Sequence, residues 1–189
     1  MSGFALHLLR HGAPETPGLL LGHTDAAPTA GGIRACVKRQ DGLAIDALIA
    51  SDLQRAMLAG QAIGTTRGLP LATDPRWREL DFGAWDGRAA ATVDQAALAR
   101  FWDDPEANPP PDGERWSSLV ARVGQAIAGL PPRPVLVITH GGAIRAALAH
   151  LCGFEQGQVW SFDLPYGALL SLTVWPGTSP TAQITGLRT

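Results

Sequence analysis

The sequence predicts an α/β fold: a three-layer α/β/α sandwich whose central sheet is mostly parallel, with one antiparallel edge strand. Two observations support this prediction. Short apolar segments alternate with helical segments along the chain, and this order is typical of βαβ units and a parallel sheet. The last two apolar segments flank a Pro-Gly-Thr-Ser-Pro turn, which is typical of an antiparallel pair.

The expected strands are short apolar runs that end at glycine, proline or polar residues. The first, over residues 4–9, ends at an Arg-His-Gly sequence, and the second, over residues 47–50, ends at Ser51. Runs of this kind are typical of strands buried inside a sheet. The other strands are expected over residues 70–73, 135–139, 168–175 and 182–187.

Helices are expected between these strands, and the polar residues before them predict where they begin. Thr29 is the expected N-cap of a helix over residues 29–42, and Gly42 is its expected stop. Ser51 or Asp52 is the expected N-cap of a helix that runs to about residue 67. Two later helices are expected over residues 116–129 and 142–151.

Residues 77–115 differ from this pattern, and we expect them to form a lid-like insertion over the sheet, within a single domain that spans residues 1–189. The segment contains a Gly/Trp-rich stretch, a short helix near residues 89–102 and a Pro-rich loop over residues 103–115. The tryptophans in and beside it either line an apolar pocket for an aromatic leaving group or pack the lid. They are Trp77, Trp85, Trp102 and Trp116.

The composition predicts a packed globule, because 46% of the residues are hydrophobic and 17% are charged. A formal net charge of −2 argues against a broad surface for nucleic acid or for an anionic membrane. Cys36 and Cys152 show no CxxC spacing, which favours reduced thiols in a cytoplasmic protein. The chain shows no signal-peptide pattern and no apolar run long enough to cross a bilayer.

Two of the expected strands end in a histidine with glycine beside it. The first strand ends at Arg10-His11-Gly12, and the strand over residues 135–139 is followed by His140-Gly141-Gly142. The carboxyl ends of strands in open α/β sheets are where ligands bind. We therefore expect the two histidines to meet at one edge of the sheet, in a site for phosphate.

Several groups near this edge suit a phosphate monoester, which carries a charge of about −1.5 to −2 near neutral pH. Arg10 and Arg55 offer planar guanidinium groups that hold two oxygens at once. Helix N-termini after Ser51 and after His140 add backbone donors, so Gly141 is a further candidate for substrate binding. His23, in the first loop, either touches phosphate or is an exposed loop residue.

Three side chains could carry the chemistry. His11 is the candidate nucleophile, because a neutral imidazole nitrogen attacks phosphorus and Gly12 permits close backbone approach. His140 is expected to face the same phosphoryl group as an imidazolium donor. Glu79 is the candidate acid, and its pKa, near 4.3 in a free side chain, must be raised by burial or by the substrate dianion. Its neighbours Arg76 and Arg78 would act the other way.

These motifs, in this order, resemble those of the histidine phosphatase superfamily, also called phosphoglycerate-mutase-like, over nearly the whole chain. They are LLRHG, GLLLGHTD, SDLQRA, ELDFGAWDG and VITHGGAIRAAL. The resemblance implies that His11 becomes phosphorylated, that Arg10, Arg55 and His140 bind the phosphoryl group, and that Glu79 is the acid.

Within the superfamily the chain resembles the small α-ribazole phosphatases. The likeness lies in Gly113-Glu114 before Trp116, in residues 151–154 and in Trp160-Ser161-Phe162. The chain lacks the extra length of the bisphosphoglycerate-dependent mutases, which implies hydrolysis. It departs from the family where Ala13-Pro14-Glu15 follows the first histidine and where Ala59-Gly60 follows SDLQRA, which puts substrate contacts from the first loop in question.

The expected function is metal-independent, cofactor-free hydrolysis of a small-molecule phosphomonoester through a phosphohistidine. α-Ribazole 5′-phosphate is the first candidate substrate, and a sugar phosphate, a phosphoglycerate or a broad range of esters are the others. The alternatives are a phosphoglycerate mutase-type phosphoryl transferase and a catalytically inactive phosphate-binding module of the same fold. No GxSxG or GxxxxGK[ST] sequence supports an esterase or a P-loop protein. A zinc site on His11, His23 and His140 is disfavoured by the arginine beside it. No nucleic acid or membrane is expected as a partner, and the apolar final strand could form a homodimer contact.

Overall fold

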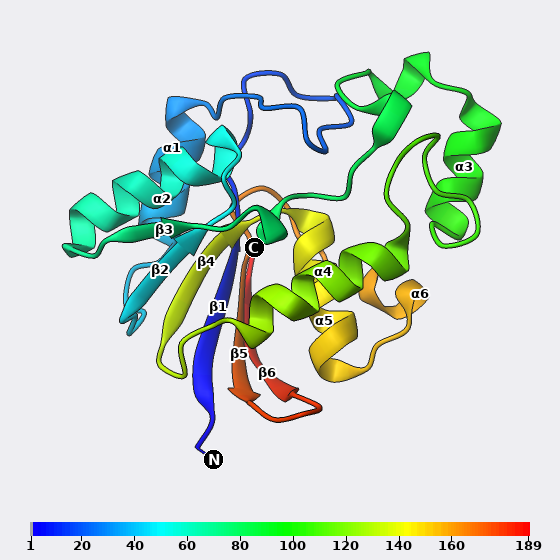
Figure 1. The fold of residues 1–189 in the computed structure, drawn as a ribbon. Coiled ribbons are helices and arrows are strands. Elements are labelled where there is room, and N and C mark those ends of the chain that lie inside the picture. The colour runs from blue at the N-terminus through cyan, green and yellow to red at the C-terminus, as the bar shows by residue number, and fades with distance from the viewer. Residues whose placement is uncertain (1) are drawn as a thin grey trace.

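The computed structural model describes residues 2–189 and shows a six-stranded sheet between two layers of helices (Figure 1). The strand order is β3-β2-β4-β1-β5-β6; the first four strands are parallel, whereas β5 and β6 form an antiparallel hairpin that continues the sheet from β1. The predicted mostly parallel sandwich is confirmed, and its expected antiparallel edge is this two-stranded hairpin. The strands are β1 (Phe4–Arg10), β2 (Ala47–Ala50), β3 (Leu71–Thr73), β4 (Val135–Thr139), β5 (Leu169–Trp175) and β6 (Thr181–Arg188).

The α-helices are α1 (Ala30–Arg39), α2 (Gln54–Arg67), α3 (Gln95–Asp103), α4 (Trp116–Ala128), α5 (Gly141–Cys152) and α6 (Gln156–Val159). Three 3-10 helices accompany them: η1 (Pro75–Trp77), η2 (Gly83–Trp85) and η3 (Ala90–Thr92). The sequence did not predict α6, because four residues are too short to show helical periodicity. None of the helices within residues 2–189 has the length and apolar character to cross a bilayer.

Alternating side chains of the central strand build the two cores. On β4, Val135 and Val137 pack with residues of α4 and α5, while Leu136 and Ile138 pack with residues of α1 and α2 on the other face. All residues of β4 are buried, as expected for a strand in the middle of a parallel sheet. Figure 1 shows the two helical layers on either side of this strand.

The strand register aligns three chain segments at the carboxyl edge of the sheet. Arg10 on β1 pairs with Thr139 on β4, and Ala50 on β2 pairs with Ile138 on β4. The residues that follow these strands therefore lie in a row across the edge, in the order Ser51, His140, His11.

Helix capping agrees with the prediction at α1 and differs from it at α2. Thr29 caps α1, because its Oγ1 accepts a hydrogen bond from the Gly32 N–H at 2.9 Å. The prediction that Ser51 or Asp52 caps α2 is wrong: the N-cap is Leu53, whose side chain makes no capping bond. A carboxylate from the first loop serves the helix instead, since the N–H of Gln54 donates to Oδ1 of Asp25 at 2.7 Å. Both expected caps have other partners, described below.

Residues 77–115 cross the carboxyl edge of the sheet and share its core. The predicted helix over residues 89–102 is two pieces, η3 and α3, because Asp94 begins a new helix by accepting the Ala97 N–H at 2.7 Å. Phe82, Trp85 and Phe101 are buried in the core cluster that also contains residues of α4 and α5.

Candidate active site

The structure brings the two predicted histidines together at the carboxyl edge of the sheet. The ring centroids of His11 and His140 lie 5.0 Å apart, with the planes inclined by 62°. The His11 side chain is buried and lines a pocket, whereas His140 is wholly buried behind it. The matching strand ends, seen already in the sequence, account for this pairing.

His11 is held as a neutral imidazole with one defined tautomer. Its Nδ1–H donates to the Gly12 carbonyl at 2.7 Å, so Nε2 carries the lone pair. Burial, together with the nearby cations of Arg55 and Arg10, lowers the pKa of His11 to about 3. The ring is therefore uncharged at neutral pH, which is the state that a nucleophilic imidazole requires.

His140 is also held neutral by its surroundings; the imidazolium was expected beside a phosphoryl group, and that expectation stays a prediction. Burial first, then the charge of Arg55, the repulsion from any proton on His11, and the charges of Arg10 and Arg122 hold its pKa well below the usual value. A proton on this ring would be both desolvated and surrounded by cations.

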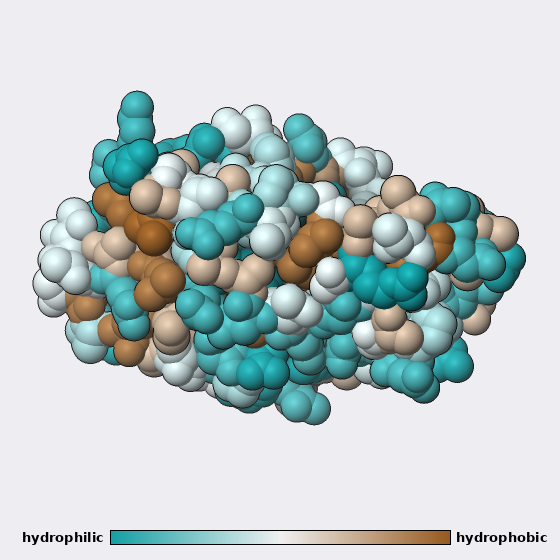
Figure 2. All heavy atoms as spheres, turned by 90° about the horizontal axis from the view of Figure 1, so that it is seen from above, coloured by the Kyte–Doolittle hydropathy of each residue, from teal (hydrophilic) through white to brown (hydrophobic). Residues whose placement is uncertain are grey.

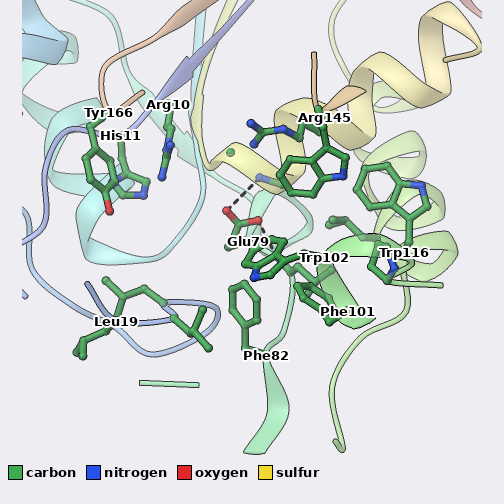
Figure 3. A pocket seen from close by; sticks show the side chains of 18 residues that line it. Arg10, His11, Leu19, Glu79, Phe82, Phe101, Trp102, Trp116, Arg145 and Tyr166 are labelled. Carbon is green, nitrogen blue, oxygen red and sulfur yellow. Dashed lines mark hydrogen bonds between the residues drawn. The ribbon is translucent and has the colours of Figure 1, made fainter. Parts of the chain in front are cut away.

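Arg10 lies at the end of β1 and lines the pocket. Its Nη1 donates to the carbonyl of Leu164, and its guanidinium carbon stands 4.3 Å from the centre of the Tyr166 ring. These two contacts fix the plane of the guanidinium beside the His11 ring (Figure 3).

Arg55 is fully buried and is absent from the pocket wall in the described chain. Its Nη atoms donate to three carbonyls of the first loop: to Leu21 at 3.0 Å, Gly22 at 2.6 Å and Thr24 at 2.8 Å. In the substrate-free site Arg55 therefore shapes the first loop and acts on the two histidines through its charge.

Glu79 points into the pocket from the insertion (Figure 3). Its two carboxylate oxygens accept the N–H of Gly142 at 3.0 Å and the N–H of Leu80 at 2.9 Å. The contact with α5 is very close, because a Cβ on Gly142 would lie only 2.1 Å from Oε1 of Glu79. Gly142 is thus a functional position that the sequence analysis did not single out.

The two arginines beside Glu79 are engaged elsewhere. Arg76 pairs with Asp74, with 2.7 Å between Nη2 and Oδ2, and Arg78 forms two hydrogen bonds with Asp52. The conflict expected from their proximity in sequence is therefore reduced in the folded chain, and Asp52 is the partner of Arg78 rather than a helix cap.

Gly12 and His23 do not line the pocket in the described residues. A Cβ on Gly12 would lie 2.2 Å from the carbonyl oxygen of Gly32, so this glycine lets the chain come close to α1. His23 has its Nδ1 3.5 Å from Oδ2 of Asp81. Gly141, by contrast, lies at the start of α5 and in the pocket wall, and its contact with a substrate stays a prediction.

The pocket has a volume of about 330 Å³ and two unlike ends. Arg10, His11 and Glu79 form the polar end, and an aromatic wall, which we define as Phe82, Phe101, Trp102, Trp116 and Trp160, forms the other. The four tryptophans differ in place: Trp102 and Trp116 line this pocket, while Trp77 and Trp85 are buried in the core, and contact with an aromatic leaving group stays a prediction. Figure 2 looks onto this side of the molecule, where apolar residues form separate patches in a largely polar surface.

Arg145 is a second pocket cation that the sequence analysis missed. Its guanidinium carbon stands 4.3 Å from the centre of a Trp160 ring, and burial lowers its pKa. A Cβ built on Gly141 would be 3.2 Å from Nη1 of Arg145 and 3.5 Å from the guanidinium of Arg10, so the two cations flank Gly141. The signal was available, because residues four apart lie on the same face of a helix.

The alternative of a zinc site finds no support in the arrangement of ligands. Within residues 2–189 no group of three or more His, Cys, Asp or Glu side chains could hold a metal ion. His23 faces Asp81 rather than the paired rings.

A mostly parallel sheet that presents imidazole, guanidinium and carboxylate groups at its carboxyl edge defines an α/β enzyme that handles phosphate esters. The family model described as "Histidine phosphatase superfamily (branch 1)" matches residues 6–184. The chain therefore belongs to this superfamily and is one of its phosphatases. This confirms the family resemblance found in the sequence.

Relatives with different substrates are similar to the chain. The adenosylcobalamin/alpha-ribazole phosphatase of Escherichia coli is 27% identical over 181 residues, which cover 89% of both proteins. A glucosyl-3-phosphoglycerate phosphatase of Mycolicibacterium vanbaalenii is 34% identical over 125 residues, 56% of this chain and 53% of that protein. The solved mycobacterial glucosyl-3-phosphoglycerate phosphatase with inorganic phosphate superimposes with a TM-score of 0.80 and 26% identity, covering 97% of this chain and 96% of that one.

Proposed function

We propose that this phosphatase hydrolyses small-molecule phosphate monoesters through a phosphohistidine on Nε2 of His11, without a metal ion or other cofactor. One observation carries the proposal. The His11 ring lines the pocket, is neutral, and has its Nδ1–H committed to Gly12, which leaves the lone pair on Nε2.

In the first step Nε2 of His11 attacks phosphorus, the N–P bond forms, and the bond from phosphorus to the ester oxygen breaks. Glu79, in its protonated form, gives a proton to the leaving oxygen, so that an alcohol departs. This proton can enter with the substrate, because the second pKa of a phosphate monoester is about 6. Arg10 balances the charge of the phosphoryl oxygens.

In the second step water attacks phosphorus, the N–P bond breaks, and the Glu79 carboxylate takes the proton that water loses. Inorganic phosphate leaves, His11 regains its lone pair, and Glu79 is again protonated. Both steps use the same carboxyl group, which the N–H groups of Gly142 and Leu80 hold in the pocket.

The aromatic wall supports α-ribazole 5′-phosphate as the substrate. The fused aromatic rings of its base can pack on tryptophan and phenylalanine rings, whereas a sugar alone needs more polar partners than this wall supplies. The similarity to the E. coli phosphatase supports the same substrate.

A phosphate ester with a neighbouring carboxylate is the second candidate substrate. Arg145 favours it, because this cation stands in the pocket near Arg10 and could hold a second anionic group. Glucosyl-3-phosphoglycerate and 3-phosphoglycerate belong to this class.

The test is a phosphatase assay with chelator present, on α-ribazole 5′-phosphate, glucosyl-3-phosphoglycerate, 3-phosphoglycerate and an aryl phosphate. We expect chelator-resistant, vanadate-sensitive hydrolysis with the highest kcat/KM on α-ribazole 5′-phosphate. His11→Ala should lose turnover and acid-labile phosphate labelling, while His150→Gln, on the far part of α5, should keep both. Turnover by His11→Ala would refute the intermediate, and a clear preference for a carboxylate-bearing ester would favour the second substrate class.

A further inference from the structure

A buried serine contacts the second histidine of the site. Oγ of Ser51 lies 2.9 Å from Nε2 of His140, and both residues are fully buried. The sheet register explains the contact, because Ser51 follows β2 and His140 follows the adjacent strand β4. The mechanism above does not use this serine.

The hydrogen-bond partners of Ser51 indicate which group donates. Its Oγ already accepts the Leu53 N–H, at 3.4 Å, and its own hydrogen needs an acceptor. Within residues 2–189, the second hydrogen-bond partner of this hydroxyl is Nε2 of His140. If Nε2–H donated to Oγ, the buried hydroxyl hydrogen would remain without an acceptor, and so would the lone pair on Nδ1 without a donor, which is unfavourable. The favoured arrangement is therefore Ser51 O–H donating to Nε2.

This direction fixes the proton of the neutral ring on the other nitrogen. With Nε2 acting as acceptor, Nδ1 of His140 carries the hydrogen. Nδ1 is buried and has no hydrogen-bond partner in the described part of the chain. The neighbouring ring is that of His11, at 5.0 Å between centroids. An N–H donor without a partner beside the nucleophile is available to a group that arrives with the substrate.

We propose that Ser51 is a positioning residue: it holds His140 as the Nδ1–H tautomer, so that the neutral ring donates a hydrogen bond to the phosphoryl group transferred to His11. The proposal rests on the function proposed above. It explains how His140 can serve as a donor without taking up a proton.

The surrounding charges make such a neutral donor useful. The charges of Arg55 on α2, Arg10 at the end of β1 and Arg122 on α4 all disfavour a proton on the His140 ring, and so would a second proton on the neighbouring His11. An imidazolium would be disfavoured among these groups, whereas a fixed N–H costs no charge. Without the serine hydroxyl the ring can adopt the Nε2–H tautomer, which turns a lone pair toward the phosphoryl oxygens. In Ser51→Ala, Nδ1 of His140 would carry a hydrogen in every molecule only if the ring were protonated on both nitrogens.

The kinetic test compares Ser51→Ala with Ser51→Thr, which keeps the hydroxyl. At pH 7.5 we expect kcat/KM of Ser51→Ala to fall about 100-fold, the loss typical of one donor to a developing anion, and Ser51→Thr to stay near wild type. The matched control is Ser171→Ala, which removes another Ser–His hydrogen bond, 2.8 Å from Oγ to Nδ1 of His7.

The second readout is the tautomer itself. The chain has five histidines, so nitrogen NMR of ¹⁵N-labelled imidazoles is tractable, and His140→Gln assigns the signal. We expect an Nδ1–H ring for His140 in the wild type and a shift toward Nε2–H in Ser51→Ala. A wild-type Nε2–H ring, or a Ser51→Ala variant with unchanged tautomer or unchanged kcat/KM, would overturn the inference. If the tautomer shifts in Ser51→Ala but the wild type hydrolyses no phosphate ester, the proposed function is refuted instead.

Discussion

At the scale of single residues, the close contact between Glu79 and Gly142 is the most demanding feature of the site. The carboxylate sits where a Cβ on Gly142 would lie, 2.1 Å from Oε1, and the backbone N–H of the same glycine is its partner. The missing side chain of Gly142 thus leaves room for the carboxylate, and the N–H of Gly142 donates a hydrogen bond to it. A side chain there must displace Glu79 or the start of α5.

We expect Gly142→Ala to impair the acid step selectively. Its kcat should fall about 100-fold on alkyl phosphates, the order of magnitude of one general acid, and much less on p-nitrophenyl phosphate, whose leaving group needs no proton. Steady-state kinetics on both substrates measures this difference. Gly157→Ala on α6, where a Cβ meets nothing within 4 Å, is the control. An equal loss on both substrates would mean that the variant disturbs more than Glu79.

Glu79→Gln should give the same pattern without a steric change. The amide cannot donate an acidic proton or accept one from water, so poor leaving groups should slow far more than activated ones. A plot of log kcat against leaving-group pKa should be steeper for the variant than for the wild type. Parallel plots would exclude Glu79 from the acid role.

At the scale of elements, the insertion and the segment after α5 meet at the mouth of the pocket. The rings of Trp102 on α3 and Trp160 lie 5.5 Å apart and nearly perpendicular, at 86°. Trp102 is 43% exposed, so it contributes more to the rim of the pocket than to the core. The edge-to-face pair joins two parts of the chain that flank the substrate.

Trp102→Ala should weaken the binding of substrates with an aromatic leaving group. We expect KM for α-ribazole 5′-phosphate to rise about tenfold, the loss expected for one aromatic pair, with a smaller change in kcat. Trp175→Ala, which removes a similarly exposed tryptophan (41%) from the end of β5, is the matched control. An unchanged KM would argue that the wall does not contact the leaving group.

At the scale of the whole molecule, the buried neutral histidines of the site make the folded chain less stable in acid. The folded chain keeps His11 neutral with a pKa of about 3, while the unfolded chain protonates it near 6.5. The unfolded state therefore binds more protons between these values, and the stability that is full above pH 6.5 is lost as the pH falls. His140, whose pKa is also lowered, acts in the same direction.

Urea unfolding between pH 7 and pH 4 measures this effect. Each buried histidine should lower the free energy of unfolding by up to about 1.4 kcal/mol per pH unit below 6.5. His11→Asn should give a shallower slope than the wild type, and Gly157→Ala, which changes no titratable group, should give an unchanged one. Equal slopes for wild type and His11→Asn would show that the ring is protonated without cost in the folded chain.

Much of this molecule is predictable from local sequence. The strands that end at His11 and at His140 are apolar runs with clear limits, and pairing them as parallel neighbours brings the two rings together. Contacts between distant segments were not predictable. Asp25 accepts a hydrogen bond from the first turn of α2, and Ser51 contacts His140, only because separate loops converge. No local sequence pattern predicts either contact.

The charge state of the site was also beyond the sequence. The neutrality of His140 results from complete burial among cations that come from separate elements. Arg145 differs from this, because its position four residues after Gly141 on α5 was legible in the sequence.

The contact between Gly12 and Gly32 has a consequence for the history of the protein. A Cβ on Gly12 would lie 2.2 Å from the Gly32 carbonyl oxygen, and a Cβ on Gly32 would lie 2.8 Å from backbone atoms of Ala13, so neither glycine can become alanine unless the facing backbone moves. A side chain at Gly32 in α1 would displace the backbone next to the nucleophile His11, although α1 contributes nothing to the pocket wall in the described chain. We therefore expect selection for activity to keep glycine at both positions.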